Sequence, residues 1–179
     1  MKLGVMGGAM GKVAVDITAS GFSPEVYGEI IAISACEMFA PGQVGAFFHS
    51  YIRPSRGLAP LWERLLEVDN ETLHSAPPLC EVAEQFFAFL DGRKIVCNGY
   101  EMASEYFNDA LAQLNRAALP RSAFLSVWDL VPTEIFETSL EAIDEYAEIP
   151  PESAYPSKQS SLRVAQAYWN VFAKQGMSD

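Results

Sequence analysis

Cysteine, histidine and basic side chains are all scarce in this chain of 179 residues. Its three cysteines, Cys36, Cys80 and Cys97, lie far apart and lack the short paired spacing of a zinc site or a redox motif. We therefore expect a reducing, cytoplasmic setting. Twelve Lys and Arg stand against 23 Asp and Glu, which gives a formal net charge of −11. Because phosphate backbones are bound mainly by clustered Lys and Arg, this balance argues against broad, nonspecific affinity for nucleic acid.

Long hydrophobic runs are missing as well. The densest apolar stretches are broken by Glu, Gly or Pro before they approach the roughly 18 residues of a membrane span, so we expect a soluble protein with no membrane partner. Half of the residues are nonetheless apolar, enough at this length for a core without disulfide or metal support. We predict a single domain at 12–174, preceded by a flexible leader at 1–11, or by translation that starts at Met10, and followed by a tail at 175–179.

The apolar patterns predict five strands and five helices. Strands are expected at 12–18, 29–39 and 44–52, arranged as a meander, and then at 94–97 and 124–128. Helical spacing predicts helices at 61–67, 78–90, 101–114, 140–146 and 160–173. This order predicts an α/β fold with a mixed five-stranded sheet flanked by helices. In such folds the reactive site gathers at strand ends and the adjoining helix starts.

Six local strings are informative when they are taken in order: VAVDITASG, GEIIAISACEMF, FFHSYIRP, NETLHSAPPLCEVAEQFFAFLDG, IVCNGYE and LRVAQAYWNVF. They resemble the DEDD 3'-5' exonucleases of the ribonuclease H-like fold. The most similar branch is the DEDDh, DnaQ-like group that contains polymerase proofreading subunits and ribonuclease T. In that family four carboxylates hold two Mg²⁺ or Mn²⁺ ions, which activate a water, and a histidine is the general base.

The first motif of that family is an Asp on the first strand and a Glu two residues later. Here Asp16 matches the Asp, whereas Thr18 stands in the place of the Glu. Strand side chains alternate with period two, so both should project to the same side of the sheet. The resemblance makes Asp16 a catalytic and metal-binding candidate. Its alternative role is that of an Asp at a strand end, bonded to the backbone of the following turn.

The second motif is a His-Asn pair with an Asp at the start of the next helix. Cys97-Asn98 takes the place of the pair, and an ungapped match puts Met102 in the Asp position. If one residue is missing from the turn, Glu101 takes that position and supplies an oxygen to the metal. Its alternative is an ordinary helix-start Glu, which the helix dipole favours. The resemblance also makes Asn98 a nucleic-acid contact.

The third motif places a general-base His five residues before the last Asp. In this chain those two places hold Tyr155 and Ser160. A sister branch of the family has Tyr in place of the His and its Asp four residues later, but this chain has Gln159 at that position. Thr18, Tyr155 and Ser160 form a neutral hydrogen-bonding pocket, or are arbitrary residues left by relaxed selection. Lys158 and Arg163 flank this motif and contact phosphates, or belong to a surface of paired charges.

The roles of the tryptophan and histidine side chains are also considered. Trp62, Trp128 and Trp169 either stack on bases or belong to the core, and we expect the core for the last two. His49 and His74 lie away from every motif position, and we expect them to be ordinary strand and loop residues.

These matches predict an exonuclease-like domain with impaired catalysis, which acts as a binding or scaffold module. One certain carboxylate cannot concentrate the positive charge that phosphodiester cleavage requires. The rival is an active Mg²⁺- or Mn²⁺-dependent 3'-5' exonuclease of DNA or RNA, in which Asp16 and Glu101, with Glu105 or Asp129, make an unusual metal cluster. A third reading is a subunit that docks on a protein partner. Without catalysis no cofactor is expected, and single-stranded nucleic acid is expected to bind weakly.

Overall fold

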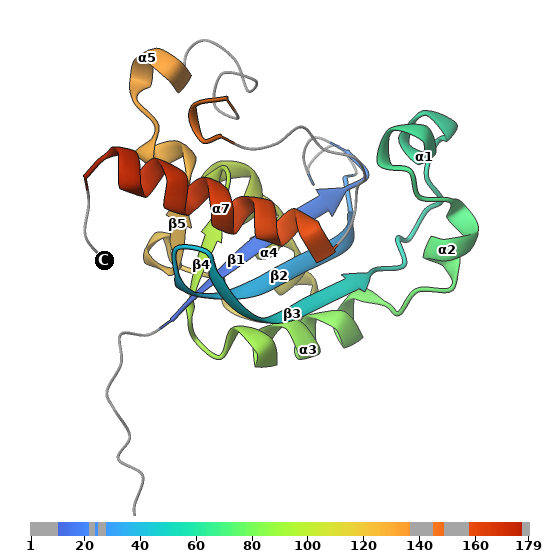
Figure 1. Ribbon diagram of the computed structural model, residues 1–179. Helices are drawn as coiled ribbons and strands as arrows, with labels where there is room; N and C mark the ends of the chain where they lie inside the picture. Colours follow the sequence, from blue (N-terminus) through green and yellow to red (C-terminus); the bar gives the residue numbers. More distant parts are fainter. Residues whose placement is uncertain (1–10, 22–23, 25–27, 137–144, 149–157, 177–179) are drawn as a thin grey trace, which may run out of the picture.

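One mixed sheet organises the chain, and the computed structural model describes residues 11–21, 24, 28–136, 145–148 and 158–176 (Figure 1). Its strands are β1 (Lys12–Ala19), β2 (Ile30–Ala40), β3 (Gln43–Tyr51), β4 (Lys94–Cys97) and β5 (Phe124–Ser126). They lie in the order β3-β2-β1-β4-β5. The first three are antiparallel, and β4 runs parallel to both β1 and β5. The predicted α/β fold with a mixed five-stranded sheet is confirmed.

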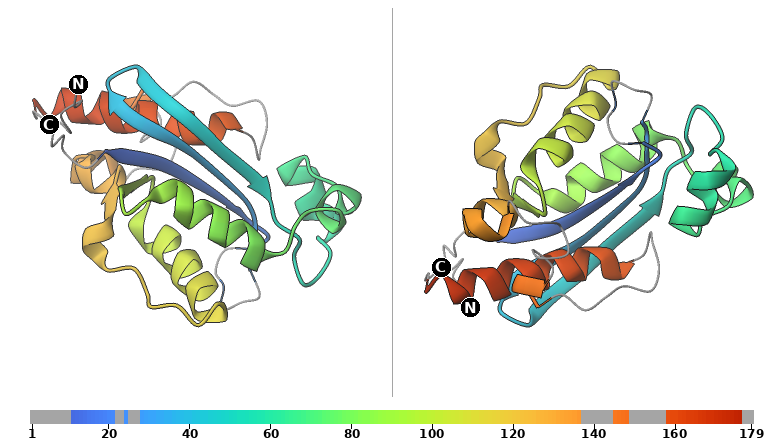
Figure 2. Two further views of the ribbon diagram at one scale, coloured as in Figure 1. Left: turned by 90° about the horizontal axis from the view of Figure 1, so that it is seen from below. Right: turned by 90° about the horizontal axis from the view of Figure 1, so that it is seen from above.

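Helices cover both faces of this sheet (Figure 2). The structure contains α1 (Pro60–Leu66), α2 (Asn70–His74), α3 (Leu79–Leu90), α4 (Tyr100–Gln113), α5 (Thr133–Phe136) and α7 (Lys158–Lys174), with the short 3-10 helices η2 (Arg121–Ala123) and η3 (Trp128–Leu130). The helices α3 and α4 pack on one face, and α7 packs on the other. In the described part of the chain, no helix combines the length and the apolar character needed to cross a membrane.

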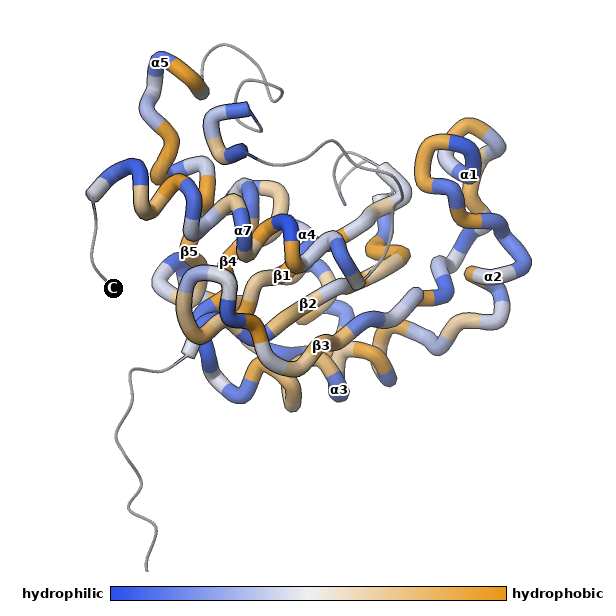
Figure 3. The backbone as a smooth tube through the Cα atoms, viewed as in Figure 1, coloured by the Kyte–Doolittle hydropathy of each residue, from blue (hydrophilic) through white to orange (hydrophobic). Residues whose placement is uncertain are grey.

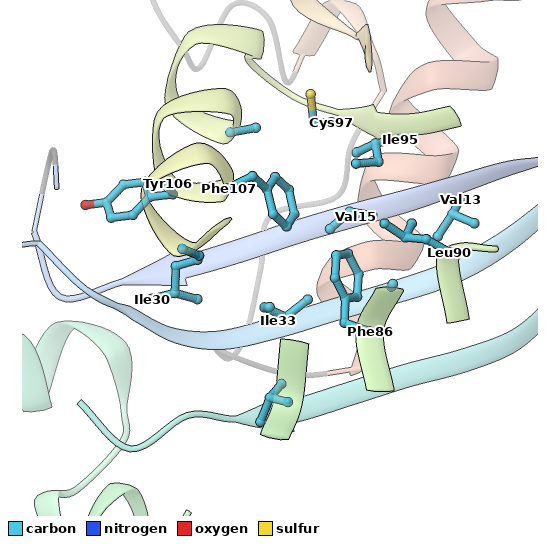
Figure 4. Packing of buried hydrophobic residues seen from close by; sticks show 14 of the residues in the cluster. Val13, Val15, Ile30, Ile33, Phe86, Leu90, Ile95, Cys97, Tyr106 and Phe107 are labelled. Atoms are coloured by element: carbon cyan, nitrogen blue, oxygen red, sulfur yellow. The ribbon is translucent and has the colours of Figure 1, made fainter. Parts of the chain in front are cut away.

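The alternation of side chains along β1 divides the core into two clusters. Val13 and Val15 face α3 and α4, where they join Phe86 and Phe107 (Figure 4). Ala14 faces the other way and packs with the α7 cluster. Because the period of a strand is two, Asp16 and Thr18 follow Ala14 onto the α7 face. This pattern places both residues of the first motif on one side of the sheet, as predicted.

The short helices α1 and α2 lie beyond the end of β3 and have a small core of their own. Leu58, Val68 and Leu73 are buried there together with Ile31 of β2. Hydrophobic stretches run along α1 in Figure 3. The helix α2 was not predicted, although Asp69 caps it by accepting a hydrogen bond from the backbone N–H of Thr72 at 2.7 Å. The expectation that His74 is a loop residue is therefore wrong, because it ends α2.

Most predicted bounds differ from the structure by one or two residues, and larger differences occur at β5 and α5. The strand expected at 124–128 ends at Ser126, because Val127 adopts helical backbone angles and begins the turn into η3. A hydrogen bond from the N–H of Trp128 to the carbonyl of Asn98, at 2.9 Å, fixes this turn. The helix α5 was not predicted. Most of the helix expected at 140–146 and nearly all of the leader at 1–11 lie outside the described residues.

Candidate functional site

A pocket of about 210 Å³ opens where β1 ends and α4 begins; we call it the candidate pocket. Its lining comes from β1 and the turn after it, from α1, and from the segment that joins β4 to α4. This is the edge of the sheet at which the sequence predicted a site. The predicted residues that the structure brings together here are Asp16, Thr18, Asn98 and Met102.

On the β1 side, the candidate pocket is lined by Asp16, its acidic residue among those that the structure describes. Asp16 is partly exposed, whereas Thr18 is only 7% exposed. In the pairing with β2, Asp16 lies opposite Ser34 and Thr18 opposite Ala32, and the register shifts between Thr18 and Ala19. Irregularities of this kind bend a strand at its end and are common beside functional sites. Asp16 and Thr18 thus line the same pocket from one strand.

The β4 side is held by backbone hydrogen bonds. The carbonyl of Asn98 accepts hydrogen bonds from the N–H of Trp128 at 2.9 Å and from Oγ of Ser126 at 3.0 Å. Gly99 is the N-cap of α4, and a Cβ added to it would lie 2.6 Å from the ring of Trp128. Only glycine fits between that ring and the helix start. This rigid segment presents Asn98 and Met102 to the pocket.

The alternatives that the sequence left open for the tryptophans are resolved by position. Trp62 of α1 is partly buried and lines the candidate pocket. Trp169 is buried in the core of α7, and Trp128 packs on Gly99 and against the same core. Of the three, Trp62 is the one that lines the candidate pocket, and it also packs against the small core beneath α1 and α2. Its position could not be read from the motifs, because α1 is distant in sequence from both β1 and β4.

Tyr106, a buried residue of α4, also lines the pocket. Its phenol donates a hydrogen bond to the carbonyl oxygen of Gly21 at 2.7 Å. Burial, together with the charges of Glu105 and Asp109, raises the pKa of the Tyr106 phenol to about 12. The phenol therefore stays protonated near neutral pH and holds the turn after β1 against α4.

Of the remaining predicted residues, those whose side chains the structure describes do not line the candidate pocket. Glu101 lies in the first turn of α4 and is exposed. Ser160 is 2% exposed in α7, and Arg163 is partly buried further along the same helix. Tyr155 lies outside the described residues, as does the side chain of Lys158. Asp129, considered for the metal cluster, pairs with Arg121 and lines a different groove.

The donors of the candidate pocket do not match the ligand set of two divalent ions. Hard cations such as Mg²⁺ need several anionic oxygens, and within the described part of the chain the lining supplies a single carboxylate, that of Asp16. Met102, which the ungapped match places in the Asp position, offers a soft thioether instead. Among the described residues, no group of three or more His, Cys, Asp or Glu side chains is arranged to hold a metal ion.

Cys97, which also lines the pocket, is not a nucleophile in this structure. Burial raises the pKa of its thiol to about 12, and the charge of Arg121 lowers it only in part. The thiolate is the reactive form, so a thiol with this pKa is inert near neutral pH. The polar chemistry of the pocket therefore comes from Asp16, Thr18 and Asn98.

Comparison with known proteins reveals distant relatives. No protein-family model matches the chain. The DNA polymerase III subunit epsilon of Rickettsia felis is 26% identical over 108 residues, which are 60% of this chain and 47% of that subunit. The chain spans about half the length of the curated relatives it matches.

Solved structures share the fold over nearly the whole chain. The nuclease domain of 3'hExo, a DEDDh family member bound to rAMP, aligns with a TM-score of 0.75 at 14% identity and covers 93% of each chain. Exonuclease X in complex with 5' overhanging duplex DNA aligns with a TM-score of 0.67 at 12% identity, covering 93% of this chain and 94% of that one. By sequence relationship and by its ribonuclease H-like fold, the chain is a relative of the DEDD-type, DnaQ-like superfamily of 3'-5' exonucleases.

Proposed function

We propose that this domain is a catalytically impaired exonuclease-like module whose candidate pocket holds the end of a nucleic-acid strand. The observation that carries the proposal is the lining of that pocket, in which Asp16 is the single carboxylate among the residues that the structure describes. Thr18, and in the ungapped match Met102, stand where the family resemblance expects acids. A pair of divalent ions brings four positive charges. One carboxylate leaves most of that charge uncompensated, so phosphodiester hydrolysis by two metal ions lacks its ligands here.

Binding remains chemically feasible because it needs a flat apolar surface and a few hydrogen bonds. Trp62 supplies an indole face, and stacking of one base on such a ring contributes about 1–3 kcal/mol. The side chains of Asn98 and Thr18 carry donors and acceptors for a base or a sugar. Two of the structural relatives were solved with rAMP and with duplex DNA, which supports a nucleic-acid end as the ligand.

Affinity is expected to be low. The net charge of −11 repels a phosphate backbone, so stacking rather than charge has to provide most of the binding free energy. We therefore expect weak binding of single strands, and a smaller loss of affinity with added salt than a basic nuclease shows.

The decisive experiment separates cleavage from binding. A labelled single-stranded oligonucleotide is incubated with the protein and Mg²⁺ or Mn²⁺, with Asp16→Asn as the matched variant. We expect no degradation above background in either sample. Degradation by the unchanged protein that Asp16→Asn abolishes would show that the domain is an active exonuclease, and the proposal would be wrong.

Binding is measured on the same oligonucleotide by fluorescence anisotropy. Trp62→Ala should weaken it about fivefold or more, because it removes the stacking surface. Leu65→Ala is the control, since Leu65 lies on the same helix, is 59% exposed and does not line the candidate pocket. Equal losses in the two variants would place the ligand elsewhere.

A further inference from the structure

A further concave site lies on the segment that carries α1 and α2; we call it the arginine groove. Its volume is about 410 Å³, within the range of roughly 300–1,000 Å³ that is usual for ligand sites. One wall is the loop that leaves β3, residues 53–57, and the other is α2, which contributes Asn70, Glu71, Leu73 and His74. None of these residues lines the candidate pocket, so the two sites are separate.

Hydrogen bonds fix both walls of the arginine groove. The carboxylate of Glu29 accepts from the backbone N–H of Ser55 at 2.6 Å and from its hydroxyl at 2.7 Å. The side chain of Asn70 accepts from the N–H of Leu58 at 2.6 Å and donates to the carbonyl of the same residue at 3.0 Å. A Cβ added to Gly57 would lie 3.0 Å from the amide oxygen of Asn70. These contacts join the loop to the start of β2 and to α2, so the groove keeps its shape without a ligand.

Cations outnumber acids in the lining of the arginine groove. Arg53 and Arg56 come from the loop, and Glu71 is the acidic residue among the described lining residues. The whole chain has 12 Lys and Arg against 23 Asp and Glu, so this local excess of positive charge is contrary to the overall balance. Arg56 already takes part in another interaction, so Arg53 is the guanidinium left for a ligand.

Arg53 and His74 line the arginine groove from its two walls, and both are exposed. Neither side chain has a hydrogen-bond or ion-pair partner among the described residues. A guanidinium presents several N–H donors in a planar fork that matches phosphate, and a neutral imidazole adds one more N–H. Donors on opposite walls suit a phosphate group, which has several oxygens. A carboxylate has only two oxygens, and one guanidinium satisfies both, so it gains less from the second wall.

The arginine groove lies within reach of the candidate pocket. Gly57 lines the groove and Trp62 lines the pocket, and five residues of chain extend over at most about 18 Å. Stacked nucleotides of one strand are about 3.4 Å apart, so roughly five of them cover that distance. A strand whose end lies in the candidate pocket therefore reaches the groove within a few nucleotides.

We propose that the arginine groove binds a backbone phosphate of the strand whose end occupies the candidate pocket, with Arg53 and His74 as the phosphate ligands. The inference rests on the proposed function and adds a second contact several nucleotides from the strand end. With a net charge of −11, most of the surface repels a phosphate backbone, so one local contact of this kind holds the strand where long-range attraction does not.

The test compares two labelled single strands by fluorescence anisotropy, a dinucleotide that reaches only the candidate pocket and an oligonucleotide of roughly 12 nucleotides that spans both sites. We expect Arg53→Gln to weaken the longer strand about fivefold or more and His74→Ala about twofold or more, with the affinity of the dinucleotide unchanged. In Arg53→Gln the slope of log affinity against log salt should also fall by about 0.7, the value for one lost phosphate contact on a single strand. Arg64→Gln is the matched control, because Arg64 is an exposed residue of α1 that lines neither site.

The same titrations separate this inference from the proposed function. If Trp62→Ala weakens both strands and Arg53→Gln weakens neither, the candidate pocket binds the strand end and the phosphate site is overturned. If Trp62→Ala weakens neither strand, the proposed function fails, and the inference fails with it. Equal losses in Arg53→Gln and Arg64→Gln would show diffuse attraction by surface charge and overturn the site. Displacement of the longer strand by an equal concentration of a polyglutamate peptide would overturn it too, because the groove would then be a carboxylate site.

Discussion

Tyr106 of α4 donates a hydrogen bond to the carbonyl oxygen of Gly21, 85 residues earlier in the chain, at 2.7 Å. The ring is buried against the main core, and its hydroxyl points outward toward the end of β1 (Figure 4). Gly21 permits this contact because the chain returns close beside it, so that a Cβ there would lie 3.0 Å from the Cα of Gly28. One phenol thus ties the turn after the first motif to the helix that follows the second.

Replacement of Tyr106 by Phe removes that tie and leaves the ring in place. We expect the free energy of unfolding to fall by about 1–2 kcal/mol, because the carbonyl of Gly21 loses its partner. Urea denaturation followed by tryptophan fluorescence measures the change. Tyr100→Phe is the matched control, since the described residues give the Tyr100 hydroxyl no hydrogen bond, and it should change stability by less than about 0.5 kcal/mol. Similar losses in both would contradict this role of Tyr106.

Substitution of Gly99 tests how closely the start of α4 packs against Trp128 at the second motif. Alanine at this position would bring a Cβ to 2.6 Å from the ring of Trp128, so helix start and ring must move apart. We expect Gly99→Ala to destabilise the fold by about 1–3 kcal/mol, the range for an overpacked core. Gly11→Ala is the control, because its Cβ would meet the side chain of Arg93 at an ordinary 3.5 Å. Thermal unfolding followed by circular dichroism compares the two, and an unchanged midpoint for Gly99→Ala would contradict the expected clash.

The sheet could be predicted from the sequence because its strands appear as short apolar runs, which alternate where one face is buried and are continuous where both faces are. The Pro41-Gly42 pair indicates the turn between β2 and β3, and the apolar residues of β4 indicate a buried strand. The end of β5 was predicted two residues too late, because aromatic residues such as Trp128 are common in strands. The conformation of Trp128 is set instead by its contact with Gly99. The helix α2 was missed because five residues carry too little helical periodicity, and only the cap at Asp69 marks it.

The candidate pocket was predictable in part. Asp16, Thr18, Asn98 and Met102 follow from the family resemblance, and strand alternation adds that Asp16 and Thr18 share one side of the sheet. Trp62 could not be assigned to it, because its place depends on how the α1 and α2 segment packs beyond β3.

The carboxylate of Glu37 makes the free energy of unfolding depend on pH in the acid range. The backbone N–H of Ala46 and the guanidinium of Arg93 both donate to its carboxylate, and they lower its pKa below the ordinary value of 4.5. A carboxylate whose pKa is lower in the folded state stabilises the fold above the unfolded pKa, and this stability is lost as pH falls through the folded value. Glu37→Gln should therefore cost about 1 kcal/mol at pH 7 and progressively less below about pH 4.

Chemical denaturation at several pH values checks that expectation. Glu84→Gln is the control, because Glu84 also pairs with an arginine, Arg116, but with its side chain 67% exposed. Exposed pairs contribute little, so we expect this variant to stay within about 0.5 kcal/mol of the unchanged protein throughout. A difference between Glu37→Gln and the unchanged protein that does not shrink at low pH would contradict the assignment.

The strongest test of the impaired pocket is to restore its acids. The double variant T18E/M102D places two further carboxylates in the lining beside Asp16, at the positions that the family resemblance assigns to them. Without metal these like charges should repel, and a Glu at the buried Thr18 position should lower stability by about 1–3 kcal/mol. Manganese ions should reverse that loss, because three carboxylates offer the anionic oxygens that one does not.

Thermal unfolding with and without Mn²⁺ measures the reversal. Ligand present at about a hundred times its dissociation constant stabilises a fold by about 2.7 kcal/mol, so the midpoint of T18E/M102D should rise by several degrees and fall again with a chelator. Adding Asp16→Asn to the double variant should abolish most of this rise, which separates binding in the pocket from binding elsewhere on an acidic surface. If Mn²⁺ stabilises the unchanged protein equally, and Asp16→Asn alone abolishes that stabilisation, then the native lining already holds the ion.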